Sequence, residues 1–289
     1  MGVVPLFILV GVVWLAYANG ANSSEKVIRP SPCKGDLAPW GTRPMHLLGS
    51  AVILAMLVMM PLTGHADSAS VLVVGKFSSA SEGTGLPNGW KPLTFPKIQR
   101  HTRYEVVKDG QTPVVRAASE AAASGLVHEV KVDLKKFPIL HWRWKVINVI
   151  SKGNVRTKQG DDYAARIYIT FEYDPDKADF STRMKYRMGR LLFGDLPIAA
   201  LNYIWENSTP PGTIVASAYT DRSKMIVVES GLDRVGQWIE EQRNVYEDYK
   251  QAFGEEPPLV NGVAIMTDTD NTGEEATAFY GDIGFKRER

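Results

Sequence analysis

The alternation of apolar and polar residues predicts that most of the chain forms β-strands. In residues 140–146, one face carries only apolar side chains, namely Leu140, Trp142, Trp144 and Val146. Such a period of two is typical of a strand with one buried face. Similar patterns occur at residues 71–77, 126–134, 165–173, 213–219, 225–229, 237–244, 262–267 and 277–285.

Turn-forming residues separate several of these predicted strands. They occur at Asp109-Gly110, at Asp174-Pro175 and at Pro210-Pro211-Gly212. Many short strands with few helices between them favour an antiparallel sandwich over a fold of alternating strands and helices. The predicted fold class is therefore mainly β, an antiparallel, jelly-roll-like β-sandwich.

Two segments have helical character. Residues 182–205 carry Met and Leu at helical spacing, are interrupted near Gly194 and Pro197, and resume as an apolar run at 198–204. They predict a short helical insertion between strands. Residues 246–253 predict one further helix, which ends at Gly254 and the prolines that follow.

The N-terminal region is different in character. Residues 3–18 are largely apolar, and the charge-free residues 44–66 contain an unbroken apolar run at 51–60. Both apolar runs are short for a membrane span, which needs about 20 apolar residues. Each segment ends in small residues, as secretory signals do. We expect Met45 to be the true start, with 45–66 a signal peptide and 1–44 a non-native or disordered extension. Residues 67–289 then form a single β-sandwich domain. The alternative is a membrane anchor at residues 3–18.

The composition excludes several classes of protein. The chain is 44% hydrophobic, and its 33 Lys and Arg residues balance 32 Asp and Glu residues. A disordered chain would be less apolar, and a dedicated nucleic-acid-binding protein would have a basic excess. The single Cys, Cys33, excludes a disulfide framework. Since residues 67–289 lack Cys, they suit an exported, periplasmic protein.

The sequence contains no recognisable catalytic motif. The glycine and histidine patterns of serine hydrolases, nucleotide-binding loops and zinc proteases are missing. His101, His128 and His141 lie far apart and lack the spacing of metal ligands. We assign no catalytic residue, leave open whether the chain is an enzyme, and favour a non-catalytic role.

Two acidic segments are candidates for binding. Asp161 and Asp162 precede a predicted strand that contains Arg166. Adjacent carboxylates repel each other unless a cation or hydrogen-bond donors hold them, so this is either a ligand or cation site with Arg166 as partner, or a charged turn. Asp268 and Asp270 begin a segment with the spacing of a calcium loop, but Phe279 stands where an EF-hand needs Glu. A calcium-binding loop of another kind and an Asp-rich hairpin turn both remain open.

Aromatic and amide residues suggest a sugar-binding surface. Trp142 and Trp144 share the apolar face of their strand, so we expect them in the core. Trp90 follows a turn and Trp205 ends a predicted helix, so we expect both to be exposed platforms on which a sugar can stack. Arg243-Asn244, near a strand end, offers a guanidinium and an amide, although pairing of Arg243 with a carboxylate within the sheet is equally compatible with the sequence.

A set of longer motifs carries a family resemblance. They lie at residues 160–168, 200–205, 243–248, 262–273 and 279–285. Together they resemble a bacterial domain-of-unknown-function family, number 3047, over roughly residues 71–287. The resemblance implies an exported protein with a sandwich similar to galactose-binding-like and carbohydrate-binding jelly rolls. It also implies a structural calcium site that includes an acidic residue of the last strand, here Asp282.

Three functions follow as hypotheses. We favour a non-catalytic glycan-binding module of the cell envelope, with calcium at Asp268, Asp270 and Asp282. Its candidate ligand-binding residues are Trp90, Asp161, Asp162, Arg166, Asn202, Trp205, Arg243 and Asn244. The alternatives are a glycan-active hydrolase that pairs Asp161 or Asp162 with Asp268 or Asp270 at about 5–10 Å, and an assembly module that uses the insertion at 182–205. We expect no nucleic-acid partner, and membrane contact only through the N-terminal apolar segments.

Overall fold

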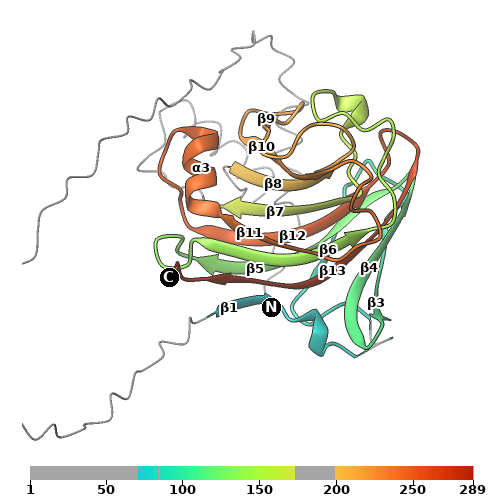
Figure 1. The fold of residues 1–289 in the computed structure, drawn as a ribbon, viewed down its shortest axis with the longest axis horizontal. Coiled ribbons are helices and arrows are strands. Elements are labelled where there is room, and N and C mark those ends of the chain that lie inside the picture. Colours follow the sequence, from blue (N-terminus) through green and yellow to red (C-terminus); the bar gives the residue numbers. More distant parts are fainter. Residues whose placement is uncertain (1–70, 82, 84, 173–198, 289) are drawn as a thin grey trace, which may run out of the picture. The chain divides into compact units, whose positions relative to one another are not determined.

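The computed structural model describes residues 71–81, 83, 85–172 and 199–288, which form two β-sheets (Figure 1). The signal peptide, extension and anchor predicted within residues 1–66 lie outside the described residues. Residues 182–198 of the predicted helical insertion do so as well. The mainly β class that the alternation predicts is confirmed.

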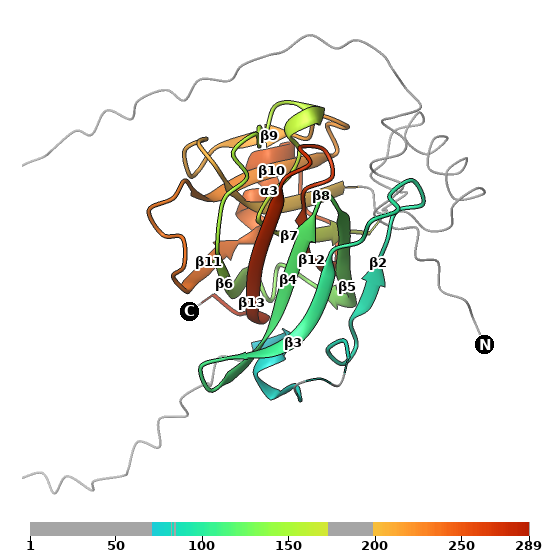
Figure 2. The same cartoon turned by 90° about the vertical axis from the view of Figure 1, so that its right-hand side faces the viewer.

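The first sheet is antiparallel throughout. Its strands run in the order β11 (Ile239–Asn244), β6 (Ile139–Val146), β13 (Glu275–Lys286), β4 (Thr112–Glu120) and β3 (Arg103–Asp109), and β1 (Val71–Gly75) pairs with the end of β13. The hairpin of β3 and β4, whose strands run side by side in Figure 2, was not predicted. Only the turn between these two strands was predicted. In this turn Gly110 adopts a φ of +63°, a left-handed conformation that favours glycine.

The second sheet contains the longer run of neighbouring strands. Their order is β2 (Lys91–Leu93), β5 (Ala123–Val132), β12 (Val260–Asp268), β7 (Ala165–Phe171), β8 (Ala199–Glu206), β10 (Ser223–Ser230) and β9 (Ile214–Ala216). All neighbours are antiparallel except β8 and β10, which are parallel. The antiparallel sandwich is thus confirmed, with one parallel pair that the sequence did not indicate.

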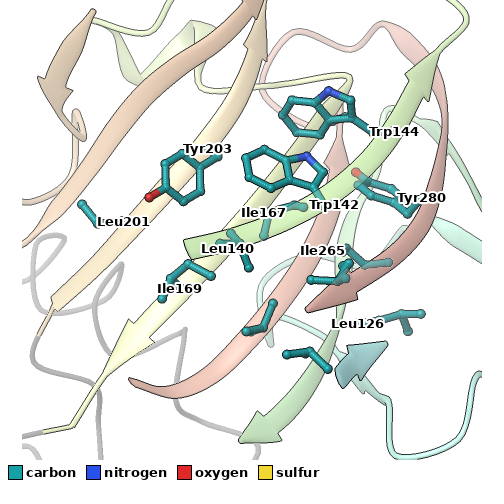
Figure 3. Close-up of a cluster of buried hydrophobic side chains, with 14 of the residues drawn as sticks. Leu126, Leu140, Trp142, Trp144, Ile167, Ile169, Leu201, Tyr203, Ile265 and Tyr280 are labelled. Atoms are coloured by element: carbon teal, nitrogen blue, oxygen red, sulfur yellow. The ribbon is translucent and has the colours of Figure 1, made fainter. Parts of the chain in front are cut away.

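The core lies between the two sheets and is rich in aromatic rings (Figure 3). The prediction that Trp142 and Trp144 are core residues is confirmed. The ring of Trp142 lies 5.4 Å from that of Tyr203, and the ring of Trp144 lies 6.1 Å from that of Trp205. Strand β6 of one sheet therefore packs directly against β8 of the other.

The helix predictions met different outcomes. The helix predicted at 246–253 is confirmed as α3 (Val245–Phe253), and it ends at Gly254 in a left-handed conformation. The helix predicted at 198–204 is wrong for residues 199–204, which lie in β8 (Ala199–Glu206), whereas residue 198 lies outside the described residues. Both faces of β8 are buried, so its apolar residues do not alternate with polar ones and give no strand signal. Within the described ranges, no helix is long and apolar enough to span a bilayer.

Candidate functional site

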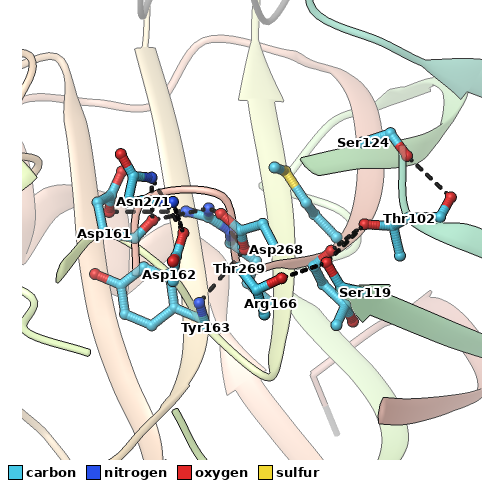
Figure 4. A network of polar contacts seen from close by, with 12 residues as sticks. Thr102, Ser119, Ser124, Asp161, Asp162, Tyr163, Arg166, Asp268, Thr269 and Asn271 are labelled. Carbon is cyan, nitrogen blue, oxygen red and sulfur yellow. Dashed lines mark hydrogen bonds and ion pairs between the residues drawn. The ribbon is translucent and has the colours of Figure 1, made fainter. Parts of the chain in front are cut away.

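The two acidic segments singled out in the sequence meet at one end of the second sheet. Strands β7 and β12 are antiparallel neighbours, and Arg166 of β7 pairs in register with Met266 of β12. Asp161 and Asp162 precede β7, and Asp268 ends β12. The start of one strand thus adjoins the end of the other, which brings the acidic segments together (Figure 4).

Three carboxyl groups converge there. Asp162, Asp268 and Asp270 each offer an oxygen atom, and these atoms all lie within 4.8 Å of one another. Asp162 and Asp268 are buried, and Asp270 is partly exposed. We call these three residues, together with the adjacent Asp161, the carboxylate cluster.

Arg166 supplies the positive charge at the cluster. Its Nε donates to Oδ1 of Asp268 at 3.0 Å, and its Nη2 forms an ion pair with the same carboxylate. Its Nη1 lies 3.8 Å from Oδ1 of Asp161. The guanidinium carbon is 4.8 Å from the ring centre of Tyr163 and 5.3 Å from that of Tyr168, so two aromatic rings hold the charged group.

Asp162 fixes the loop that follows β12. Its carboxylate accepts hydrogen bonds from the backbone N and the Oγ1 of Thr272, both at 2.7 Å, and from Nδ2 of Asn271 at 3.1 Å. These donors hold the side chain of Asp162 against the loop. The loop in turn places Asp270 beside Asp162.

The cluster carries an excess of negative charge. Among the described residues of the cluster, four carboxyl groups face the guanidinium of Arg166. Burial, assisted by the neighbouring Asp162 and Asp270, raises the pKa of Asp161 to about 6. Burial and Asp162 also raise the pKa of Asp270. The hydroxyl of Tyr163 is buried and interacts with Asp161, and this burial and the charge of Asp161 raise its pKa. A bound cation would relieve the charge excess of the cluster.

Two residues form the exposed rim of the cluster. The hydroxyl of Tyr219 donates to Oδ1 of the exposed Asn271 at 3.3 Å. The ring of Tyr219 is partly exposed, and burial and the charges of Asp161 and Asp270 raise the pKa of its hydroxyl to about 12. Sequence reasoning missed Tyr219, because it lies in a loop far along the chain from the acidic segments and carries no motif of its own.

Asn202 lies on the same sheet as the cluster but in the interior. It pairs in register with Tyr168 of β7 and is fully buried. Its Nδ2 donates to Oγ of Ser223 at 2.8 Å, whereas its Oδ1 has no hydrogen-bond partner. The position therefore fits a structural role as well as the predicted ligand contact, which stays a prediction.

The expectation that Trp90 and Trp205 are exposed platforms is wrong. Trp90 is 5% exposed, and its ring lies 5.2 Å from that of Phe77. Trp205 is 1% exposed in β8, and its Nε1 donates to the carbonyl oxygen of Gly231 at 3.2 Å. Trp205 was misplaced because its strand was interpreted as a helix, and the turn before Trp90 gave no sign that the chain folds back.

Three further candidates are held by partners outside the cluster. Arg243 makes a two-pronged ion pair with Asp248, which is the alternative that the sequence left open. Asn244 caps α3 by accepting from the backbone N of Glu247 at 3.1 Å. Asp282 lies in β13 as predicted, but it does not join Asp268 and Asp270. Its carboxylate instead accepts from N and Oγ of Ser78, at 2.7 and 2.6 Å.

Comparison with known proteins supports the family resemblance. A family model described as "Protein of unknown function (DUF3047)" matches residues 88–284, which is more than half of the chain. None of the curated proteins compared with the chain matches it.

Several solved structures with similar strand arrangements are carbohydrate-binding proteins. The family 30 carbohydrate-binding module of a Clostridium thermocellum cellulosomal cellulase has 11% identity and a TM-score of 0.33, over 76% of this chain and 94% of the module. The CBM22-1 xylan-binding domain of Paenibacillus barcinonensis Xyn10C has 9% identity and a TM-score of 0.34, over 76% and 97%. The carbohydrate recognition domain of Emp47p has 12% identity and a TM-score of 0.39, over 78% and 99%. Likenesses this remote carry no argument about function.

Proposed function

The chain belongs to the DUF3047 family of proteins of unknown function, and because that description assigns no activity, we propose a function from the site itself. We propose that this protein is an exported, non-catalytic glycan-binding module of the cell envelope, and that its carboxylate cluster holds a calcium ion. The observation that carries the proposal is the convergence of Asp162, Asp268 and Asp270 within 4.8 Å beside the guanidinium of Arg166.

The chemistry of the donors favours calcium over other metals. All the groups that converge are oxygen donors, and the described residues of the cluster include neither His nor Cys. Hard cations take such ligands, whereas zinc and copper favour nitrogen and sulfur. Calcium accepts about 6–8 oxygen ligands in flexible geometry. Magnesium needs a stricter octahedron and retains most of its waters.

A glycan would bind at the rim of this site. Asp270 and Asn271 are accessible, so a bound calcium has a side on which sugar hydroxyls can complete its ligands. The ring of Tyr219 is partly exposed, held by its bond to Asn271, and the ammonium of Lys158 lies 5.2 Å from its centre. The C–H groups of the sugar would pack against the ring on the side away from Lys158. This rim replaces the buried Trp90 and Trp205 as the aromatic part of the proposed surface.

A glycan-array screen of the full chain, in calcium and again in EGTA, tests this proposal. We expect selective binding in calcium, loss of that binding in EGTA, and a loss of at least tenfold in affinity for Tyr219→Ala and for Asp270→Asn. Asp221→Asn, at an exposed acidic residue, is the matched control and should bind normally. Calcium-independent binding, or normal binding by both rim variants, would contradict the assigned site.

The hydrolase alternative keeps one supporting observation. The acidic segments converge, as paired-carboxylate catalysis requires. However, Asp162 and Asp268 are both buried, so neither carboxyl group is open to a glycan substrate. Release of reducing ends from a bound glycan, abolished in Asp162→Asn, would favour the hydrolase.

Export remains part of the proposal. Its basis is the apolar segment at 45–66 and the absence of Cys from residues 67–289. N-terminal sequencing of the protein recovered from producing cells should read from Asp67. A chain that starts at Met1 or Met45 would contradict a cleaved signal.

The assembly alternative used residues 182–205 as the surface for a partner. Residues 199–205 lie in the buried strand β8, so this part of the segment is not available to a partner.

A further inference from the structure

The first sheet carries aromatic and basic side chains on the face that points away from the core. The core-facing tryptophans of β6 alternate with Arg143 and Lys145, which therefore lie on the opposite face. Phe279 of β13 pairs in register with Lys145 and lies on that face too. We call Arg143, Lys145, Phe279 and Trp238, which directly precedes β11, the outer platform. The carboxylate cluster belongs to the other sheet.

The indole of Trp238 is held in place by side chains of other strands. Its Nε1 donates to Oδ2 of Asp109 at 2.5 Å, and Nζ of Lys145 donates to the same oxygen at 2.5 Å. The guanidinium carbon of Arg143 lies 4.7 Å from the centre of the indole, and Nζ of Lys145 lies 5.3 Å from it. Because these contacts already fix the partly exposed ring, a ligand that stacks on it orders no further side chain.

A second aromatic ring belongs to the same platform. Nζ of Lys145 lies 4.6 Å from the ring centre of Phe279, which is also partly exposed. The rings of Phe279 and Trp238 are neighbours, since both contact this one ammonium group. Two neighbouring aromatic rings offer apolar contacts for the C–H groups of successive sugars in a chain.

Arg143 is the basic group of the platform that lacks a carboxylate partner. Asp109 pairs with Lys145, whereas no residue of the described ranges forms an ion pair with Arg143. Glu240 of β11 pairs in register with Arg143, but it is exposed and its carboxylate does not reach the guanidinium. A Cβ at Gly281 would clash with Cγ and Nε of Arg143, so this side chain lies against the backbone of β13. A partly buried guanidinium with unused N–H donors suits a carboxylate ligand.

We propose that the outer platform is a second binding surface of the protein, and that its ligand is an insoluble glycan of the cell wall that carries carboxylate groups. Sugars of the polymer stack on Trp238 and Phe279, and a carboxylate beside them pairs with Arg143. The proposal rests on the envelope location in the proposed function, but it needs no cation. Stacking of one sugar on one ring is a weak contact, so binding depends on the many chains that the polymer presents, and short soluble glycans give no array signal here.

Co-sedimentation of the full chain with purified peptidoglycan sacculi, in EGTA, tests the proposal. We expect Trp238→Ala to bind at least fivefold less tightly than the wild type. Tyr246→Ala removes a partly exposed ring on α3 that also lies beside a cation, so it is the matched control and should bind as the wild type. Failure of the two proposals is distinguishable, because sedimentation in EGTA reports on the outer platform and calcium-dependent array binding reports on the carboxylate cluster.

The role of charge is tested with sacculi whose carboxyl groups have been converted to amides. The wild type should bind native sacculi at least fivefold more tightly than amidated ones. Arg143→Gln should lose this preference, because it removes the partner of the carboxylate. Arg287→Gln, at an exposed arginine over the ring of Phe137, should keep the preference.

If Trp238→Ala fails to fold, the indole N–H resonance of Trp238 in the wild type decides the matter. Soluble fragments of the sacculi, added at millimolar concentration, should shift this resonance and leave that of the buried Trp144 in place. The proposal is overturned if the wild type does not sediment with sacculi, if it binds native and amidated sacculi equally, or if the Trp238 resonance does not move.

Discussion

At the scale of single residues, Arg166 is the group on which the carboxylate cluster depends. Its side chain is 3% exposed, and it offsets part of the charge of Asp161, Asp162 and Asp268. Removing one partner of a buried charge network leaves the other charges uncompensated, which costs far more than the loss of an exposed ion pair. Calcium at the same cluster would supply part of the missing positive charge.

We therefore predict that Arg166→Gln lowers the free energy of unfolding by about 3 kcal/mol or more in EGTA, and by less in calcium. The matched control is Arg116→Gln, which breaks the exposed pair with Glu105 and should cost no more than about 1 kcal/mol. Urea denaturation of both variants, with and without calcium, makes the comparison. Equal and small losses in the two variants would mean that Arg166 does not balance the cluster.

At the scale of elements, the sequence placed most of the described strands but mistook one of them for a helix. Strand β6 buries one face, so Leu140, Trp142 and Trp144 alternate with polar residues and could be placed from the sequence. Strand β8 buries both faces and was mistaken for a helix. Helix α3 could be predicted because its end carries a local signal, the left-handed Gly254, whereas its cap, Asn244, was interpreted as a ligand-binding residue.

The cap at Asn244 gives a prediction that separates a structural role from a ligand role. Asn244→Ala should lower the free energy of unfolding by about 1 kcal/mol, because the backbone N of Glu247 loses its acceptor. Asn244→Asp should keep most of the stability, and glycan binding should be unchanged in both variants. Loss of glycan binding with unchanged stability would restore Asn244 to the ligand-binding surface.

At the scale of the whole molecule, the sandwich brings together segments that are far apart in sequence. The acidic character of 161–162 and 268–270 was visible in the sequence, but their meeting depends on the pairing of β7 with β12, which no local pattern specifies. For the same reason Asp282 could be placed on its strand but not assigned its partner, Ser78. The position of Tyr219 at the rim is likewise a product of tertiary structure and has no signature along the chain.

The central claim is that the carboxylate cluster binds a divalent cation, and calcium titration of the full chain by isothermal calorimetry tests it most directly. We predict one site per chain in the wild type and in Asp221→Asn, and no measurable site in Asp270→Asn, which removes a charged ligand without disturbing the pair of Asp268 with Arg166. If the wild type binds no calcium, or if Asp270→Asn binds it as the wild type does, the cluster is a structural charge network and the proposed cation site is wrong.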